Sequence, residues 1–309
     1  MTEHIIVTSG WSFSDIDAVV CALLYADLLK WEGKSAEAVL PGIINNTLTQ
    51  EIRSWLPPIT VEPTKPATSY VVVDVSELNQ IAKFVELDLV TEVYDHHFGR
   101  ELFWSKLIKQ RAIIEPVGAC ATLVWEQIKR RGYSSHLNQT QARLLYSAII
   151  SNSMNLTARI TSDRDRQAAA ELKMLAGLDD DWIPRYYRDQ ERALLRDPIA
   201  TIKADTKDQW LPELNQNIVI GQIEMWDGAN YIRNHAKEIE LALTSFGNPD
   251  WFMTIPSINR VKNYLLVSND SVKQLLQTAI GAKFRGNRGQ TSQMYMRKEI
   301  LREIARTFG

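Results

Sequence analysis

Apolar and polar positions alternate in blocks along the first half of the chain. Short apolar runs predict strands over residues 4–9, 70–74, 89–94 and 112–114. The nearly continuous β-branched run at residues 70–74 is typical of a central parallel strand that is buried on both faces. Apolar residues at helical spacing predict helices over residues 15–29, 118–131, 139–151 and 164–175. Ser162 precedes the last of these helices and is a good N-cap candidate. Strands that alternate with helices predict an α/β fold with a doubly wound parallel sheet.

The pattern changes after about residue 188, where strands become the commoner element. We predict strands over residues 199–204, 217–225, 250–255 and 263–267. One helix over residues 229–244 separates the middle pair, and a shorter one is predicted over residues 271–277. These elements predict a smaller, mixed α/β domain. The expected organisation is therefore a first domain of residues 1–190, a linker of residues 191–195 and a second domain of residues 196–309.

Composition changes this picture little. The 309 residues are 45% apolar and 23% charged, which is typical of a globular protein with two domains. The net charge of −2 provides no overall attraction for nucleic acid. Cys21 and Cys120 both lie in apolar helical patterns, so we interpret them as core residues. No leader or membrane-spanning run is evident, and we expect a cytoplasmic protein with no membrane partner.

Polar side chains follow three of the predicted strands. They are Asp15 with Asp17, then Asp74, and then the triplet Asp95-His96-His97. Taken singly, Asp15 is explained by an N-cap and Asp74 by a turn. In a parallel sheet, however, all three turns emerge at one edge, where four carboxylates would repel one another without a cation. A set of ligands that contains several carboxylates and one imidazole favours Mn²⁺ or Mg²⁺ over a structural zinc ion.

The end of the chain is locally basic. Seven cations between residues 283 and 306 are balanced only by Glu299 and Glu303. Residues 281–289 contain too many glycines for a stable helix and are predicted to form a mobile loop. Such a basic loop would suit a phosphate-rich substrate.

The order of these motifs resembles the DHH phosphoesterases, which are named for their Asp-His-His triplet. The closest resemblance is to the branch with a DHHA2 second domain, which contains manganese-dependent family II inorganic pyrophosphatases and exopolyphosphatases. Residues 10–18 are similar to the first motif, Gly-His-x-x-Pro-Asp-x-Asp-Ser, and Asp74 matches the second-motif aspartate. Residues 118–124 are similar to a Gly-Ser-x-Ala-Thr-Leu-Val helix. The resemblance continues through Asp205-Thr206-Lys207 and residues 296–299.

The resemblance implies a hydrolase with up to two Mn²⁺ ions per chain, or Mg²⁺ or Co²⁺, in a cleft between the two domains. The implied metal ligands are Asp15, Asp17, Asp74 and His96, with Asn152 as a weaker one. The implied phosphate-binding and catalytic residues are His97, Lys207, Arg297 and Lys298, and Asp95 would orient the triplet. The implied substrate is a phosphate-rich small molecule or short polyphosphate. The implied assembly is a homodimer formed through the sheet edge of the first domain.

Two departures from the family pattern leave the activity open. Trp11 replaces a histidine or asparagine, and an indole donates a hydrogen bond but cannot bind a metal. Asn152 replaces an aspartate and lacks its charge.

The leading hypothesis is metal-dependent hydrolysis of a phosphoanhydride or related phosphoester. The alternative is a catalytically weak or inactive protein that binds a phosphorylated ligand. A nuclease is disfavoured, because no basic and aromatic groove for nucleic acid is evident.

Overall fold

The computed structural model describes residues 3–309. The chain is divided into two compact units between Ile183 and Pro184. This division falls within helix α7 (Trp182–Leu194), which also contains most of the segment expected to be a linker.

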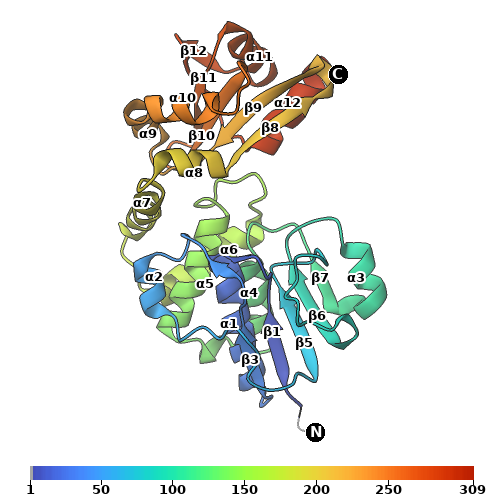
Figure 1. Cartoon of the computed structure of the whole chain (residues 1–309). Coiled ribbons are helices and arrows are strands. Elements are labelled where there is room, and N and C mark those ends of the chain that lie inside the picture. The colour runs from blue at the N-terminus through green and yellow to red at the C-terminus, as the bar shows by residue number, and fades with distance from the viewer. Residues whose placement is uncertain (1–2) are drawn as a thin grey trace. The chain divides into compact units, whose positions relative to one another are not determined.

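A five-stranded parallel sheet forms the centre of the first unit (Figure 1). Its strands are β1 (Ile5–Thr8), β3 (Ala36–Val39), β5 (Ser69–Val73), β6 (Val90–Asp95) and β7 (Ala112–Ile114). They are arranged in the order β3-β1-β5-β6-β7, and all four pairings are parallel. The strand order reverses between β1 and β5, as in a doubly wound sheet, so this prediction is confirmed. Two short strands, β2 (Phe13–Ser14) and β4 (Ile43–Ile44), pair separately.

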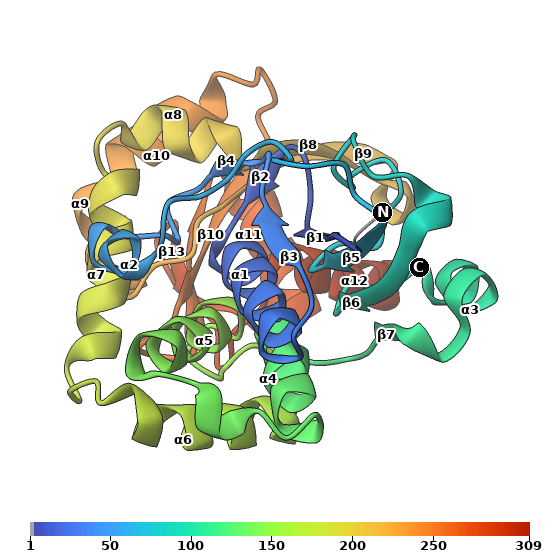
Figure 2. The ribbon, with the colours of Figure 1, turned by 90° about the horizontal axis from the view of Figure 1, so that it is seen from below.

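Helices cover both faces of this sheet. The four predicted helices are α1 (Ile16–Trp31), α4 (Cys120–Arg130), α5 (Gln139–Asn152) and α6 (Asp163–Ala176), and they pack beside one another (Figure 2). Helix α3 (Glu101–Ile108) covers the opposite face, and α2 (Gln50–Trp55) contacts α5. Side chains alternate along β6, so Val93 packs in a core cluster with Trp104 of α3, while Tyr94 contacts Tyr25 of α1.

The second unit contains a six-stranded mixed sheet in the order β12-β13-β11-β10-β9-β8. Its strands are β8 (Thr206–Leu211), β9 (Gln216–Gln222), β10 (Trp251–Ser257), β11 (Lys262–Val267), β12 (Lys283–Arg285) and β13 (Arg288–Gln290). Only β9 and β10 pair in parallel. The smaller mixed α/β unit is therefore confirmed.

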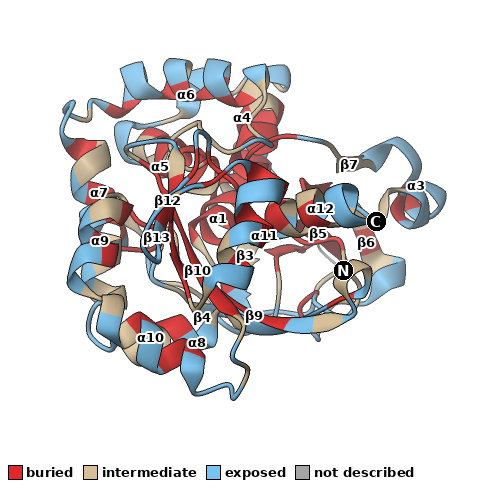
Figure 3. Ribbon diagram, turned by 90° about the horizontal axis from the view of Figure 1, so that it is seen from above, coloured by how far each residue is buried: buried red, intermediate tan, exposed pale blue. Residues whose placement is uncertain are grey.

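Two hydrophobic clusters lie on the two faces of this second sheet. One is formed with α8 (Pro198–Ala204), α9 (Gly228–Asn234) and α10 (Ala236–Thr244). The other is formed with α11 (Asp270–Ile280) and α12 (Arg297–Phe308). Figure 3 shows that the strands consist mainly of buried residues, whereas the outer faces of the helices are exposed.

Three predicted elements of the second unit are wrong. Residues 199–204 form helix α8 rather than a strand, because Asp197 caps the amide of Ala200 and Pro198 occupies the first turn. The helix expected over residues 229–244 is broken at His235 into α9 and α10. Residues 281–289 contribute to the β12–β13 hairpin instead of a loop, and Gly286 supplies its turn with a φ of 64°.

Both cysteines are buried and unpaired, which confirms their assignment to the core. Among the described residues, no helix is both long enough and apolar enough to cross a membrane.

Candidate metal centre

Polar side chains meet at the carboxyl-terminal edge of the first sheet, as the sequence predicts. Asp74 directly follows β5, Asp95 is the last residue of β6, and His96 and His97 come next. One ligand atom from each of these four residues lies within 4.8 Å of the other three. A single divalent cation could therefore contact side chains from two neighbouring strands.

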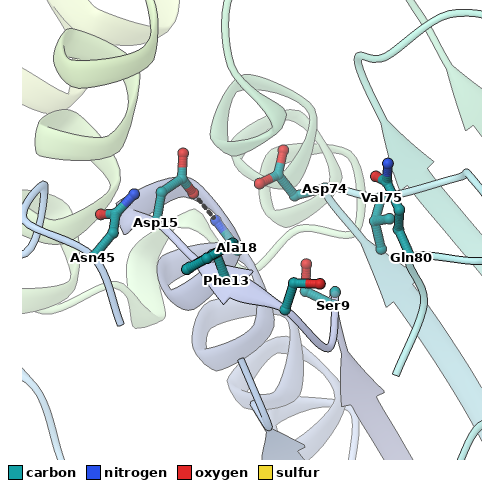
Figure 4. A pocket seen from close by; sticks show the side chains of 10 residues that line it. Ser9, Phe13, Asp15, Ala18, Asn45, Asp74, Val75 and Gln80 are labelled. Carbon is teal, nitrogen blue, oxygen red and sulfur yellow. Dashed lines mark hydrogen bonds between the residues drawn. The ribbon is translucent and has the colours of Figure 1, made fainter. Parts of the chain in front are cut away.

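A cavity of about 440 Å³ lies beside this cluster. The carboxyl groups of Asp15 and Asp74 are both directed into it, with Asn45 on the Asp15 side and Gln80 on the Asp74 side (Figure 4). Asn45 and Gln80 have no recognisable signal in the sequence. Asn45 is brought to the cavity by the pairing of β2 with β4, two strands too short to be predicted. Asp15 also caps α1, because its Oδ1 accepts from the Ala18 amide at 3.0 Å.

The ring of His96 is held in the form that can bind a metal. Its Nδ1 lies 3.1 Å from the carbonyl oxygen of Val117, which can only accept, so Nδ1 carries the proton of the neutral ring. The lone pair of the neutral ring is then on Nε2, which lies 3.2 Å from Oδ1 of Asp74. A backbone carbonyl that fixes the histidine tautomer is typical of metal sites.

Asp74 is a buried carboxylate without a full set of partners. Among the described residues, its Oδ1 has no hydrogen bond, although it faces His96. Burial raises the pKa of Asp74 well above its ordinary value, and the nearby charges of Asp17, Asp15 and Asp95 raise it further. Oδ1 of Asp74 and Nε2 of His96 face each other at 3.2 Å, and both carry lone pairs, so a proton or a cation is required between them. The donor set of carboxylates and imidazole therefore fits a divalent metal ion.

Asp95 fixes the orientation of the triplet. Its Oδ1 accepts from the amides of His96 and His97 at 2.7 and 3.1 Å, and from Nδ1 of His97 at 2.8 Å. Burial alone would raise the pKa of Asp95, but the hydrogen bond and charge of His97 hold it below its ordinary value. The side chain of His97 is 64% exposed, so its second ring nitrogen is available to a ligand.

Asp17 has a structural role that the sequence did not reveal. Its Oδ2 accepts from the Cys120 amide at 2.7 Å, and its Oδ1 accepts from the Ala121 amide at 2.8 Å. It therefore caps the first turn of α4, where the N-cap residue Ala119 has no side chain that could do so. Oδ2 also lies 3.9 Å from Nε2 of His96, which places Asp17 at the margin of the cluster.

Asn152 contacts Asp17 rather than remaining free. Its amide Nδ2 donates to Oδ2 of Asp17 at 2.6 Å. Beyond it, Met154, Asn155 and Leu156 have φ angles of 50°, 57° and 61°, a left-handed conformation that is costly for residues with a Cβ. Such strain is common beside functional sites, and here it begins two residues after the asparagine that departs from the family pattern.

Trp11 is directed toward a neighbouring loop. Its indole Nε1 donates to the carbonyl of Asn79 at 2.9 Å, and Nζ of Lys83 lies 4.0 Å from the ring centroid. Trp11 is not among the residues that line the cavity. Its side chain therefore stabilises the loop that carries Gln80.

Three candidate residues belong to the second unit. The guanidinium of Arg297 donates to the carbonyl oxygen and to Oδ1 of Asp205, at 2.7 and 2.6 Å, and its side chain is only 12% exposed. Lys207 and Lys298 are exposed to solvent. Arg297 therefore has a fixed position within this unit, whereas the two lysines project from its surface.

Comparisons with known proteins agree with these features. The profile of the DHH family, N-terminal domain, matches residues 5–149. A protein of Listeria welshimeri named as a probable manganese-dependent inorganic pyrophosphatase is 26% identical over 302 residues, which is 94% of each chain. A protein of the same name from Exiguobacterium is 30% identical over 244 residues, covering 78% of this chain and 77% of the relative. A crystal structure from Methanococcus jannaschii, assigned as a family II inorganic pyrophosphatase, superposes with a TM-score of 0.61. The two sequences are 21% identical, and the superposition covers 98% of this chain and 99% of the Methanococcus chain.

Proposed function

This chain belongs to the DHH family, and we propose that it hydrolyses a phosphoanhydride such as pyrophosphate or short polyphosphate, or a related phosphoester, with the help of a metal ion. The observation that carries the proposal is the meeting of Asp74, Asp95, His96 and His97 within 4.8 Å. The names of the relatives support Mn²⁺ as the metal and pyrophosphate as the first substrate to test.

Asp15, Asp74 and His96 would hold the metal, with Asp17 and Asn152 beside a second ion. Asp15 and Asp74 line the same cavity, and the lone pair of His96 faces Asp74. When bound, a divalent cation makes water acidic enough to act as a nucleophile near neutral pH, and it stabilises charge on phosphoryl oxygens. A cluster of acidic residues is more often a solvated surface patch than a metal site. That explanation does not apply here, because Asp17 and Asp95 are fully buried.

His97 would bind and orient the phosphate. Asp95 accepts from its Nδ1, which leaves the exposed Nε2 to face a ligand. Lys207, Arg297 and Lys298 are proposed to neutralise the charge of the substrate. Asp205 would keep the Arg297 guanidinium oriented, since it accepts from Nη2 at 2.6 Å.

The test is phosphate release by the purified full-length chain with Mn²⁺, Mg²⁺ or Co²⁺, from pyrophosphate and from tripolyphosphate. Asp74→Asn keeps the shape of the side chain but removes its charge, and we expect at least a hundredfold loss of activity and of bound metal. Asp88→Asn makes the same change at an exposed position and should have no effect. The proposal is wrong if no metal supports phosphate release and Asp74→Asn leaves the metal content unchanged.

A second candidate function is a protein that binds a phosphorylated ligand without turnover. The hydrogen bond from Asn152 to Asp17 favours it, because an amide donor occupies a carboxylate oxygen that a second metal would otherwise use. Titration calorimetry separates the two functions. The binding protein requires saturable binding of tripolyphosphate at every metal concentration with no phosphate released, whereas the hydrolase releases phosphate under the same conditions.

We further propose a homodimer that uses the edge of the first sheet. Strand β7 is the last strand on that side, and α3 beside it exposes Leu102, Phe103 and Leu107. A strand whose outer edge has no neighbouring strand, beside exposed apolar side chains, is a typical interaction surface.

A further inference from the structure

A second cavity, of about 480 Å³, lies entirely within the second unit. It is formed by the β12–β13 hairpin, by strand β11 and by helix α9. Arg297 belongs to a different part of this unit, because its guanidinium donates to Asp205 next to β8, at the opposite edge of the sheet. The second cavity is therefore separate from the residues proposed to bind the substrate.

Strand register places three cations on one face of the hairpin. Lys283 is paired with Gln290, and Arg285 is paired with Arg288. Gln290 is in turn paired with Tyr264 of β11. Residues that are paired across neighbouring strands share a face of the sheet, so all of these side chains lie on the side of Tyr264.

The phenyl ring of Phe284 packs the hairpin against the core of the second unit. Phe284 is paired with Gly289 and packs against the core cluster on the other face of the sheet. A Cβ built on Gly289 would lie 2.5 Å from Cε1 of that ring, so only glycine permits this close contact. The cationic face therefore belongs to a packed hairpin and not to a mobile loop.

The cations of this face have no acidic partners. Arg233 of α9 joins Lys283, Arg285 and Arg288 in the lining of the cavity. Within residues 3–309, no ion pair involves any of these four side chains. Lys262 adds a fifth charge nearby, with Nζ 3.0 Å from Oε1 of Gln290. Several like charges around one cavity create a positive potential that attracts a multivalent anion.

Beside the cations and Gln290, the cavity wall is largely apolar. Ile232 is buried, Ala229 and Tyr264 are partly buried, and all three line the cavity. The Tyr264 ring packs against the core on this side, and Nζ of Lys262 lies 5.4 Å from its centroid. An inorganic phosphate chain would use only the cations. A ligand with both phosphates and an aromatic ring would also use the apolar wall and the tyrosine face.

We propose that this cavity binds a nucleoside polyphosphate, with its phosphates on Lys283, Arg285, Arg288 and Arg233 and its base against Tyr264. The volume of about 480 Å³ is within the range of small-molecule sites. The inference does not depend on the proposed hydrolase, because every lining residue lies in the second unit.

The test is titration calorimetry of the full-length chain with ATP, tripolyphosphate and adenosine as probes, in EDTA. Chelation removes binding that requires a metal ion. We expect saturable binding of ATP, binding of tripolyphosphate that is at least tenfold weaker, and no detectable binding of adenosine. Arg288→Ala should weaken ATP binding about tenfold, the loss expected for one charge-assisted hydrogen bond.

Two further variants make the test specific. Arg302→Ala removes the same charge from an exposed position on α12 and should leave ATP binding unchanged. Tyr264→Leu keeps the apolar packing but removes the aromatic face, so ATP should then bind no better than tripolyphosphate. Equal binding of ATP and tripolyphosphate by the unmodified chain would overturn the proposal, as would an Arg288→Ala variant that binds ATP normally. Neither result would affect the phosphohydrolase assay.

Discussion

At the scale of single residues, the metal centre is defined by atoms that lack their usual partners. Asp74 has a φ of 57°, in the left-handed region that residues with a Cβ seldom adopt. This turn directs its carboxylate toward His96, and Oδ1 has no hydrogen bond among the described residues. Strain and an unsatisfied buried oxygen at the same position are both costly, which is expected where a ligand supplies the missing interaction.

Asn152→Asp tests how much the departure from the family pattern matters. A carboxylate at this position would face Asp17, whose Oδ2 now accepts from Asn152 at 2.6 Å. Without metal the two charges repel, and we expect the melting temperature in EDTA to fall by about 5 °C. With Mn²⁺ the added charge should tighten metal binding about tenfold and increase phosphate release.

The matched control is Asn138→Asp, at the opposite end of the same helix. Asn138 is exposed and caps α5, a role that aspartate fills equally well. Calorimetric titration with Mn²⁺ and a melting curve in EDTA measure both effects. Unchanged Mn²⁺ affinity in Asn152→Asp would show that residue 152 does not contribute to the metal site.

At the scale of elements, the beginning of α4 is held by carboxylates from two other helices. Asp17 of α1 accepts from the amides of Cys120 and Ala121. Asp165 of α6 accepts from the Gly118 amide at 2.8 Å and from Oγ1 of Thr122 at 2.6 Å. A Cβ on Gly118 would lie 3.2 Å from Oδ2 of Asp165, so the glycine allows this close approach. The metal centre is thus coupled to the packing of α1, α4 and α6.

Asp165→Ala should destabilise the first unit strongly. The change would leave the buried Gly118 amide and the Thr122 hydroxyl without an acceptor, at a cost of about 3 kcal/mol. Urea unfolding measures the loss. Asp163→Ala in the same helical turn is exposed and should cost less than about 1 kcal/mol, so equal losses in the two variants would contradict this role.

The lowered pKa of Glu32 predicts that the stability of the first unit depends on pH. Burial alone would raise its pKa, but hydrogen bonds from Lys34 and Arg131 lower it below the ordinary value of 4.5. Because the folded-state pKa is the lower one, this stabilisation is present above pH 4.5 and is lost as the pH falls through the folded-state pKa. Glu32 ends α1 and pairs with Arg131 at the end of α4 at 3.1 Å.

The variant Glu32→Gln should therefore melt below the unmodified chain at pH 7, and the difference should shrink below about pH 4. Melting curves between pH 3 and pH 7 test this. Glu86→Gln, at an exposed position whose side chain makes no cap hydrogen bond, is the control and should show no such convergence. A difference that stays constant across this range would show that Glu32 contributes by packing alone.

At the scale of the whole molecule, charged side chains of opposite sign gather in the two units. The first unit brings together the carboxylates and imidazoles, and the second contributes exposed cations, including Lys207, Lys298 and the hairpin residues. The small net charge of −2 is therefore compatible with local clusters of charged side chains of both signs. Such clusters attract ligands locally even though the whole chain does not.

The proposed homodimer can be tested at the β7 edge. Leu102 is 77% exposed on α3, and Leu102→Glu would place a charge in the proposed interface. We expect analytical ultracentrifugation to show a dimer for the unmodified chain and a shift toward monomer for this variant. Leu241→Glu, on a leucine of α10 that is 63% exposed, should leave the dimer intact. A monomeric unmodified chain at micromolar concentration would contradict the proposal.

The sequence by itself determined four of the five strands of the first sheet, the four helices α1, α4, α5 and α6, and the Asp-His-His triplet at the sheet edge; it did not predict β3 or α3. Continuous β-branched runs and helical spacing are local signals, and the topology of a parallel sheet then brings the strand ends to one edge. It predicted a strand at residues 199–204, where the N-cap Asp197 and Pro198 in the first turn instead begin a helix.

Only the tertiary structure decided how each polar side chain is used. Asp17 caps α4 through amides more than 100 positions away in the chain, and Asn152 donates to the same carboxylate. The cationic face beside Tyr264 depends on the register of three strands, of which two are only three residues long. These contacts join distant segments, so no local pattern of residues could reveal them.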